Sequence, residues 1–293
     1  MIAAKTVRFY SRYATSDPLG FYDIIRRRLV EAVSRDTGLA AVTRFGEVRF
    51  EVDLSMHKIA KKFYFHTHEM FLERIFRRHL QTGSVFIDIG ANCGYWSAFA
   101  LSLVGRSGAV HAFEPVPAYF ASVKRLAELN PGYRISAVNK ACGAVAGTAR
   151  MAAVLPNMKN FGNYRTNIGS SSLADGFLDH ARDLTTLIDV EIIPLDEYLA
   201  QNFIDLSSIG LIKIDVEGYE KSVLDGMVSA LGKSGPKIPI LCEVLTDITR
   251  PNPLKGADIV EKLSAFGYRC LDATSLRPVQ PENFGFEENL ICV

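Results

Sequence analysis

Apolar runs and helical patterns alternate along the chain from Ser84 onward. Residues 85–89 form a short, almost continuous apolar run, which is the pattern of a strand buried in a parallel sheet. Helical spacing of apolar residues follows at 91–104. We predict further strands at 109–113, 134–138, 209–214, 237–244 and 286–293, and further helices at 117–129, 219–231 and 257–266. This alternation predicts an α/β fold with a parallel sheet and helices on both faces.

The first 82 residues carry a different pattern. We predict a helix, a hairpin that turns at Gly46 and a basic, aromatic-rich segment that ends in a helix, at residues 21–35, 42–54 and 56–80. Gly83 stands at the expected C-terminal cap of the last helix. The chain is therefore expected to have an N-terminal α/β extension over 1–82 and a larger domain over 83–293.

A glycine-rich turn follows the first predicted strand of the larger domain. Asp88 stands two residues before Gly90, and Gly94 follows four residues after Gly90, with Asn92 between them. Such a turn lets the backbone approach a ligand closely and places the first amides of the next helix near it. The spacing differs from the G-x-G-x-x-G of dinucleotide-binding folds. An acid at this place disfavours a pyrophosphate and suits a ligand with a cationic amino-acid portion.

An acid also stands at the end of the second predicted strand. Glu114 follows twenty residues after Gly94. An ionised carboxylate has only hydrogen-bond acceptors, so it suits the two neighbouring hydroxyls of a ribose. Together, the turn and the acid indicate a nucleoside-bearing cofactor.

Five sequence blocks occur in a distinctive order: FIDIGANCGYWSAFAL, VHAFEPVP, NKACGAVAG, LIKIDVEGYEKSVLDGM and ILCEV. Over residues 83–272 they resemble the FkbM family of S-adenosylmethionine-dependent methyltransferases. The resemblance implies a Rossmann-like, seven-stranded class I methyltransferase sheet, mostly parallel with an antiparallel last strand. It also implies methyl transfer to a hydroxyl oxygen of a sugar, polysaccharide or natural product, with S-adenosylhomocysteine as the second product.

The resemblance further implies where the parts of this cofactor lie. Asp88, Gly90, Asn92 and Gly94 would hold its methionine portion, Glu114 its ribose, Asn139 and Cys142 its adenine, and Asp215 its methyl-donor end.

Three acids are the predicted catalytic residues. Asp215 and Glu217 follow one predicted strand, and Glu243 ends the next. Because ligands of open α/β sheets bind at the carboxyl ends of the strands, these side chains are expected to meet. A hydroxyl acceptor loses a proton during methyl transfer, so the acids can act as a general base or hold the acceptor. They are also ligands that magnesium accepts, although nothing else in the sequence supports a metal.

The family pattern differs from this chain near Glu243. Members often carry a histidine shortly after this acid, whereas Val244, Leu245 and Thr246 follow it here. No histidine proton relay is therefore predicted at this place.

One segment fits no helix or strand. Residues 155–172 are rich in Asn, Gly and Ser, and a long loop in a compact domain is usually functional or disordered. We expect this loop and the N-terminal extension to cover the acceptor pocket.

Composition narrows the class of protein. The 293 residues include 33 Lys and Arg against 32 Asp and Glu, which argues against a dedicated nucleic-acid binder. No apolar run has the length of a membrane span. The five cysteines are scattered without a C-x-x-C pair, so neither a disulfide framework nor a zinc site is expected. These features predict a soluble protein of the reducing cytoplasm; the sequence is silent on oligomeric state.

Two other functions remain open from the sequence. A nicotinamide-dependent dehydrogenase can use the same first strand, turn and helix, although the glycine spacing argues against it. A non-catalytic scaffold protein can keep the cofactor pocket without transferring a methyl group.

Overall fold

The computed structural model describes residues 40–54, 58–153, 173, 186–232, 235–245, 256–281, 284–285 and 287–293. The predicted helix at 21–35 and the whole of the loop at 155–172 lie outside these residues.

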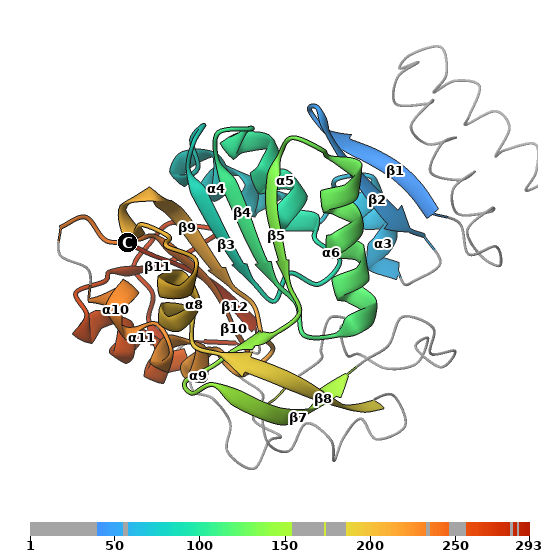
Figure 1. Cartoon of the computed structure of the whole chain (residues 1–293). Helices are drawn as coiled ribbons and strands as arrows, with labels where there is room; N and C mark the ends of the chain where they lie inside the picture. Colours follow the sequence, from blue (N-terminus) through green and yellow to red (C-terminus); the bar gives the residue numbers. More distant parts are fainter. Residues whose placement is uncertain are drawn as a thin grey trace, which may run out of the picture.

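A seven-stranded sheet forms the centre of the molecule, in the order β11-β12-β10-β9-β3-β4-β5 (Figure 1). Its strands are β3 (Val85–Ile89), β4 (Ala109–Phe113), β5 (Arg134–Val138), β9 (Ile209–Ile214), β10 (Ile240–Leu245), β11 (Cys270–Asp272) and β12 (Glu287–Cys292). The pairs from β10 to β5 are parallel, and β12 is antiparallel to both of its neighbours. The predicted class I methyltransferase sheet is thereby confirmed.

Helices cover both faces of this sheet (Figure 1). One face packs against α4 (Glu73–His79), α5 (Tyr95–Val104) and α6 (Pro117–Leu129). The other packs against α8 (Leu195–Gln201), α9 (Glu220–Asp225), α10 (Val228–Leu231) and α11 (Gly256–Ala265). Side chains alternate along β3, so Phe86 joins the first core and Ile87 the second.

The predicted hairpin is present at the N-terminal end of the described chain. Strands β1 (Ala40–Phe45) and β2 (Val48–Asp53) pair in antiparallel register, and Gly46 turns between them with φ of 59°. Asn130, at the end of α6, accepts a hydrogen bond from Arg49 N and donates one to Arg49 O, both at 2.8 Å. Strand β2, the inner strand of the hairpin, is therefore bound to α6 through its backbone.

The basic segment after the hairpin differs in detail from its prediction. It contains α3 (Lys58–Tyr64), the 3₁₀ turn η1 (Met70–Leu72) and α4. Gly83 does not cap α4, because the capping residue is Leu80 and the chain is already extended there. Gly83 instead has φ of 94° in the next turn and donates a hydrogen bond to Val104 O.

A second, three-stranded sheet was not predicted. It has the order β6-β8-β7, with β6 (Ala141–Cys142), β7 (Gly147–Ala153) and β8 (Thr186–Ile193). Helix α8 and the 3₁₀ turn η3 (Leu206–Ser208), which follow it, were also missed. This small sheet lies beside the carboxyl ends of the main strands (Figure 1) and packs on Val116 and Tyr119.

Two predicted helix boundaries are wrong, and the backbone at glycine residues explains both. The helix predicted from residue 91 begins at Tyr95, because Gly90 and Gly94 have positive φ. The helix predicted at 219–231 is two helices, α9 and α10, separated at Gly226. A Cβ on Gly226 would lie 2.0 Å from Gly143 O, so the chain passes too closely there for a side chain.

The expectation about cysteines is corrected at one pair. Cys270 and Cys292 face each other on β11 and β12 and form a disulfide. Cys93, Cys142 and Cys242 are free and buried. The reducing cytoplasm was inferred from unpaired cysteines, so the cysteine pattern no longer supports that compartment. Among the described residues, no helix combines the length and apolar character required to traverse a bilayer.

Candidate active site

A pocket of about 640 Å³, partly open to solvent, lies at the carboxyl ends of β3, β4 and β9. Six of the residues predicted to bind cofactor or act in catalysis line it: Gly90, Asn92, Glu114, Cys142, Asp215 and Glu217. The turn after β3, the end of β4 and the end of β9 therefore meet as predicted.

The turn after β3 is held in shape by its neighbours. Gly90 and Ala91 donate backbone hydrogen bonds to Phe113 O at 3.0 and 2.9 Å. Gly90 has φ of 83°, and a Cβ there would lie 1.8 Å from Asp215 O. Only glycine fits this position without moving β9, so the turn leaves backbone rather than side chain at the floor of the pocket.

Glu114 is tied into the same turn. Its Oε2 accepts a hydrogen bond from Asn92 N, and its Oε1 accepts one from Val116 N, both at 2.8 Å. The side chain is 5% exposed. Burial raises the pKa of Glu114 to about 7, although the bonds from Val116 and Asn92 act in the opposite direction. Its charge can therefore change near neutral pH.

Asn92 helps to place these groups. It has φ of 51°, an uncommon value outside glycine, and its side-chain Oδ1 accepts a hydrogen bond from Cys93 N at 2.7 Å. This local bond offsets the cost of the left-handed conformation, which presents Asn92 N to Glu114.

Asp88 lies behind the turn, outside the set of described residues that line the pocket. It is fully buried, and its Oδ2 accepts a hydrogen bond from Ser97 Oγ at 2.5 Å. Its Oδ1 has no hydrogen-bond partner among the described residues. Burial raises the pKa of Asp88, while Lys213 and the bond from Ser97 lower it.

Gly94 and Asn139 also support the pocket from outside its lining. Gly94 precedes α5 with φ of 86° and packs against Val123 and Leu126 of α6. Asn139 donates hydrogen bonds to Glu114 O and Pro115 O at 2.9 and 3.0 Å. Their direct contact with a cofactor stays a prediction.

The wall expected to meet adenine is mostly apolar. Cys142 lines it and is 2% exposed, and burial raises the pKa of its thiol, so it acts as a small apolar side chain. Tyr119, Met151 and Leu173 complete the wall. Met151 and Leu173 were missed from the sequence because Met151 belongs to the unpredicted small sheet and Leu173 follows the loop. Tyr119 lies on a predicted helix, but its helical pattern gave no sign that it lines a pocket.

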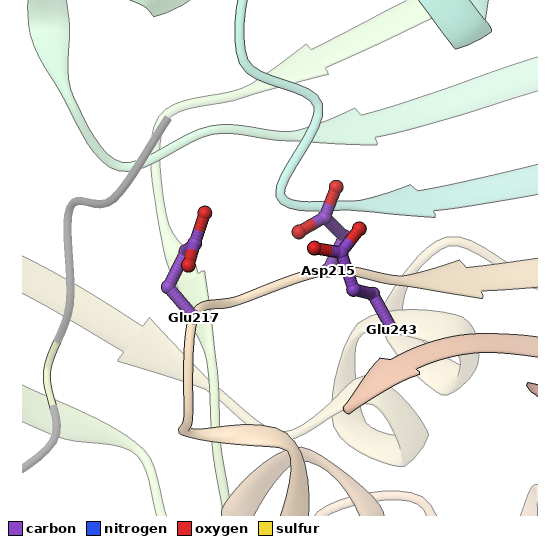
Figure 2. Close-up of side chains that lie close together, drawn as sticks. All are labelled: Asp215, Glu217 and Glu243. Atoms are coloured by element: carbon purple, nitrogen blue, oxygen red, sulfur yellow. The ribbon is translucent and has the colours of Figure 1, made fainter. Parts of the chain in front are cut away.

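The three predicted acids come together at the ends of β9 and β10. Figure 2 shows Asp215, Glu217 and Glu243 turned toward one space, and one carboxylate oxygen from each lies within 4.8 Å of the others. Glu217 holds φ of 55°, an uncommon value outside glycine. This spacing can hold a metal ion, but acids also cluster at protein surfaces without one, and no metal is assigned.

A buried cation accompanies these acids and was missed in the sequence. Lys213 on β9 is 4% exposed, and its Nζ lies 2.7 Å from Asp215 Oδ2. The signal was present, because a lysine inside the apolar run LIKID needs a buried partner.

Comparison with known proteins identifies relatives of this chain. The sequence-family model of the methyltransferase FkbM domain matches residues 88–270. A curated relative is the 31-O-demethyl-FK506 methyltransferase FkbM of Streptomyces tacrolimicus. It is 29% identical over 182 residues, which cover 55% of this chain and 67% of that protein.

Solved structures match this chain at lower similarity. Precorrin-6y C5,15-methyltransferase of Geobacter metallireducens has 15% identity and a TM-score of 0.39, covering 78% of this chain and 86% of the other. M. jannaschii TYW2 in complex with AdoMet has 9% identity and a TM-score of 0.41, covering 88% and 86%. Likeness at this level says nothing about the acceptor.

Proposed function

The chain belongs to the FkbM methyltransferase family, a group of S-adenosylmethionine-dependent enzymes, and from this premise we propose that it methylates a hydroxyl oxygen. The acceptor class is a sugar, a polysaccharide or a natural product. The observation that carries the proposal is the convergence of Gly90, Glu114 and Asp215 on one pocket.

The residues present fit the cofactor. At Gly90 a side chain would collide with Asp215 O, so the backbone stays open to a close ligand. Glu114 borders the pocket and retains acceptor capacity beyond its two backbone bonds, as a ribose diol requires. Tyr119, Met151 and Cys142 give an apolar wall for adenine. When bound, S-adenosylmethionine supplies a methyl group on a cationic sulfur.

The chain's own groups then have to place the acceptor and receive its proton. Alignment of the reacting atoms supplies a large part of the rate increase in such displacements. Asp215 and Glu217 line the pocket, and the oxygens of Glu243 reach the same space. We assign the role of general base to this cluster, with Asp215 first because Lys213 fixes its orientation.

The loop at 155–172 and the N-terminal extension are proposed to cover the acceptor. Leu173, directly after that loop, lines the pocket. If deletion of 155–172 leaves acceptor turnover unchanged, this covering role is wrong.

The proposal is tested by calorimetry and by transfer of a labelled methyl group. We expect the protein to bind S-adenosylhomocysteine and not NAD, and to add one methyl group to the hydroxyl of a sugar or macrolide in an acceptor panel. Binding of NAD alone would favour the dehydrogenase. Cofactor binding without transfer to any acceptor, and a silent Asp215→Asn variant, would favour the scaffold protein.

A further inference from the structure

A buried ammonium lies among carboxylates on one face of the main sheet. Asp88 on β3 and Lys213 on β9 are directly paired neighbours in the sheet. Lys213 is also paired with Leu241 on β10. Because side chains two residues apart share a face, Asp215 and Glu243 point to the same side as Lys213. One lysine is thus placed between acids from three adjacent strands.

The ammonium of Lys213 stays charged in this setting. Burial alone would lower its pKa, but Asp215 and Asp88, with the hydrogen bond to Asp215, raise it above the ordinary value overall. Glu243 contributes in the same direction. The side chain is 5% exposed, so solvent screens its charge only weakly.

This charge acts on the cofactor pocket through Asp215. That residue lines the pocket and is bonded to Lys213 Nζ at 2.7 Å. Glu217 also lines the pocket and adds negative charge, and Glu114 does so in its ionised form. The pocket therefore faces an excess of acids that Lys213 partly neutralises.

Donor and product differ in charge at the reacting atom. S-adenosylmethionine carries a sulfonium cation, whereas the sulfur of S-adenosylhomocysteine is neutral, and the rest of the two molecules is alike. Acids beside the pocket attract the donor more than the product, and a buried cation opposes that preference.

We propose that Lys213 sets how strongly the pocket prefers the cationic donor over the neutral product. The inference rests on the proposed function, since it concerns the same pocket and cofactor. Lys213 is a positioning residue in this role, because it acts through Asp215 and through its field. With Lys213 present, the donor is held less tightly than the acids alone would hold it.

Calorimetric dissociation constants for S-adenosylmethionine, S-adenosylhomocysteine and the cationic analogue sinefungin test the proposal. Lys213→Met removes the charge and keeps most of the side-chain volume. We expect the ratio of the product's dissociation constant to the donor's to rise about five- to twentyfold, the order of magnitude for loss of one unit charge at an effective dielectric constant of about 20. Sinefungin should follow the donor. Lys213→Arg should keep the wild-type ratio.

A matched control removes a lysine from another ion pair. Lys262 of α11 pairs with Asp225 of α9 at 2.5 Å, and neither residue lines the pocket. Lys262→Met should leave both dissociation constants unchanged.

A second variant gives a change of opposite sign. Glu243→Gln removes one negative charge and should lower the ratio, and it carries the test if Lys213→Met does not fold. Equal weakening of donor and product in Lys213→Met, or an unchanged ratio in Glu243→Gln, would mean that Lys213 is only structural. If the wild-type protein binds none of the three probes, the proposed function fails first, and this inference with it.

Discussion

The backbone carbonyl of Asp215 lies 1.8 Å from the place that a Cβ on Gly90 would occupy. The turn after β3 and the end of β9 are therefore in direct backbone contact, and Asp215 N also donates a hydrogen bond to Ile89 O at 3.0 Å. The turn proposed to bind the cofactor and the proposed base are positioned by one another.

Gly90→Ala should disrupt both the turn after β3 and the position of Asp215. The new methyl group must push the end of β9 away, so we expect a loss of more than about 3 kcal/mol in the free energy of unfolding, and no measurable binding of S-adenosylhomocysteine. Gly46→Ala is the matched control, because Gly46 also has positive φ but no atom within 4 Å of the added carbon. It should cost only about 1–2 kcal/mol of backbone strain and leave binding intact.

Binding of S-adenosylhomocysteine should strengthen as the pH rises through 7. The pKa of Glu114 is raised to about 7 by burial, and ribose hydroxyls bind best to the ionised carboxylate. Below that pH, binding must release a proton, so the dissociation constant should increase by up to about tenfold per pH unit. Calorimetry on either side of neutrality measures this. A flat profile in wild type, or the same slope in Glu114→Gln, would contradict it.

The same group affects stability in the ligand-free protein. The folded state binds more protons at Glu114 than the unfolded chain between the ordinary value of 4.5 and about 7. Its contribution to stability is therefore full below 4.5 and is lost as the pH rises through that window. Glu114→Gln should remove this part of the pH dependence of chemical unfolding.

Asp215→Asn should lower turnover by about a hundredfold or more while changing the dissociation constant for S-adenosylhomocysteine much less. The reason is that the amide keeps the shape of the side chain but cannot accept the acceptor's proton. Turnover with an acceptor from the panel and calorimetry on the same preparation give both values. A variant that loses binding but keeps turnover at saturating donor would make Asp215 a cofactor ligand instead.

The Cys270–Cys292 disulfide should stabilise the edge of the sheet. It closes a segment with a sequence separation of 22, for which the loss of chain entropy predicts about 3 kcal/mol. A Cys270→Ala, Cys292→Ala double variant should unfold correspondingly more easily. Added reductant should destabilise wild type and leave the double variant unchanged. If the double variant is as stable as wild type and reductant does not destabilise wild type, the disulfide contributes nothing to stability.

The parts of the site that lie at the ends of adjacent sheet strands could be predicted from the sequence. Gly90, Glu114 and Asp215 each follow a buried apolar run, and the rules for parallel sheets place the ends of such runs at one edge. Glu243 was placed beside Asp215 by the same reasoning.

The features that the sequence did not predict depend mainly on pairing between segments that are distant in the sequence. β7 and β8 meet across a long stretch of chain, so nothing local predicted that Met151 would line the pocket. The register of β11 and β12, rather than any spacing motif, brings Cys270 opposite Cys292. Asp88 was read as a ligand-binding acid from its position, but whether a side chain faces the pocket or the core depends on the sheet face, which the turn motif does not specify.

The hydrogen bonds between Asn130 and Arg49 bear on how the protein can be divided. They fasten the hairpin to α6, and Phe45 and Phe50 of that hairpin share a core with Phe99 of α5. A fragment starting at Gly83 would contain every family motif, yet it would expose this aromatic layer to water and is expected to aggregate. Recombinant truncations should therefore keep the chain from Ala40 onward.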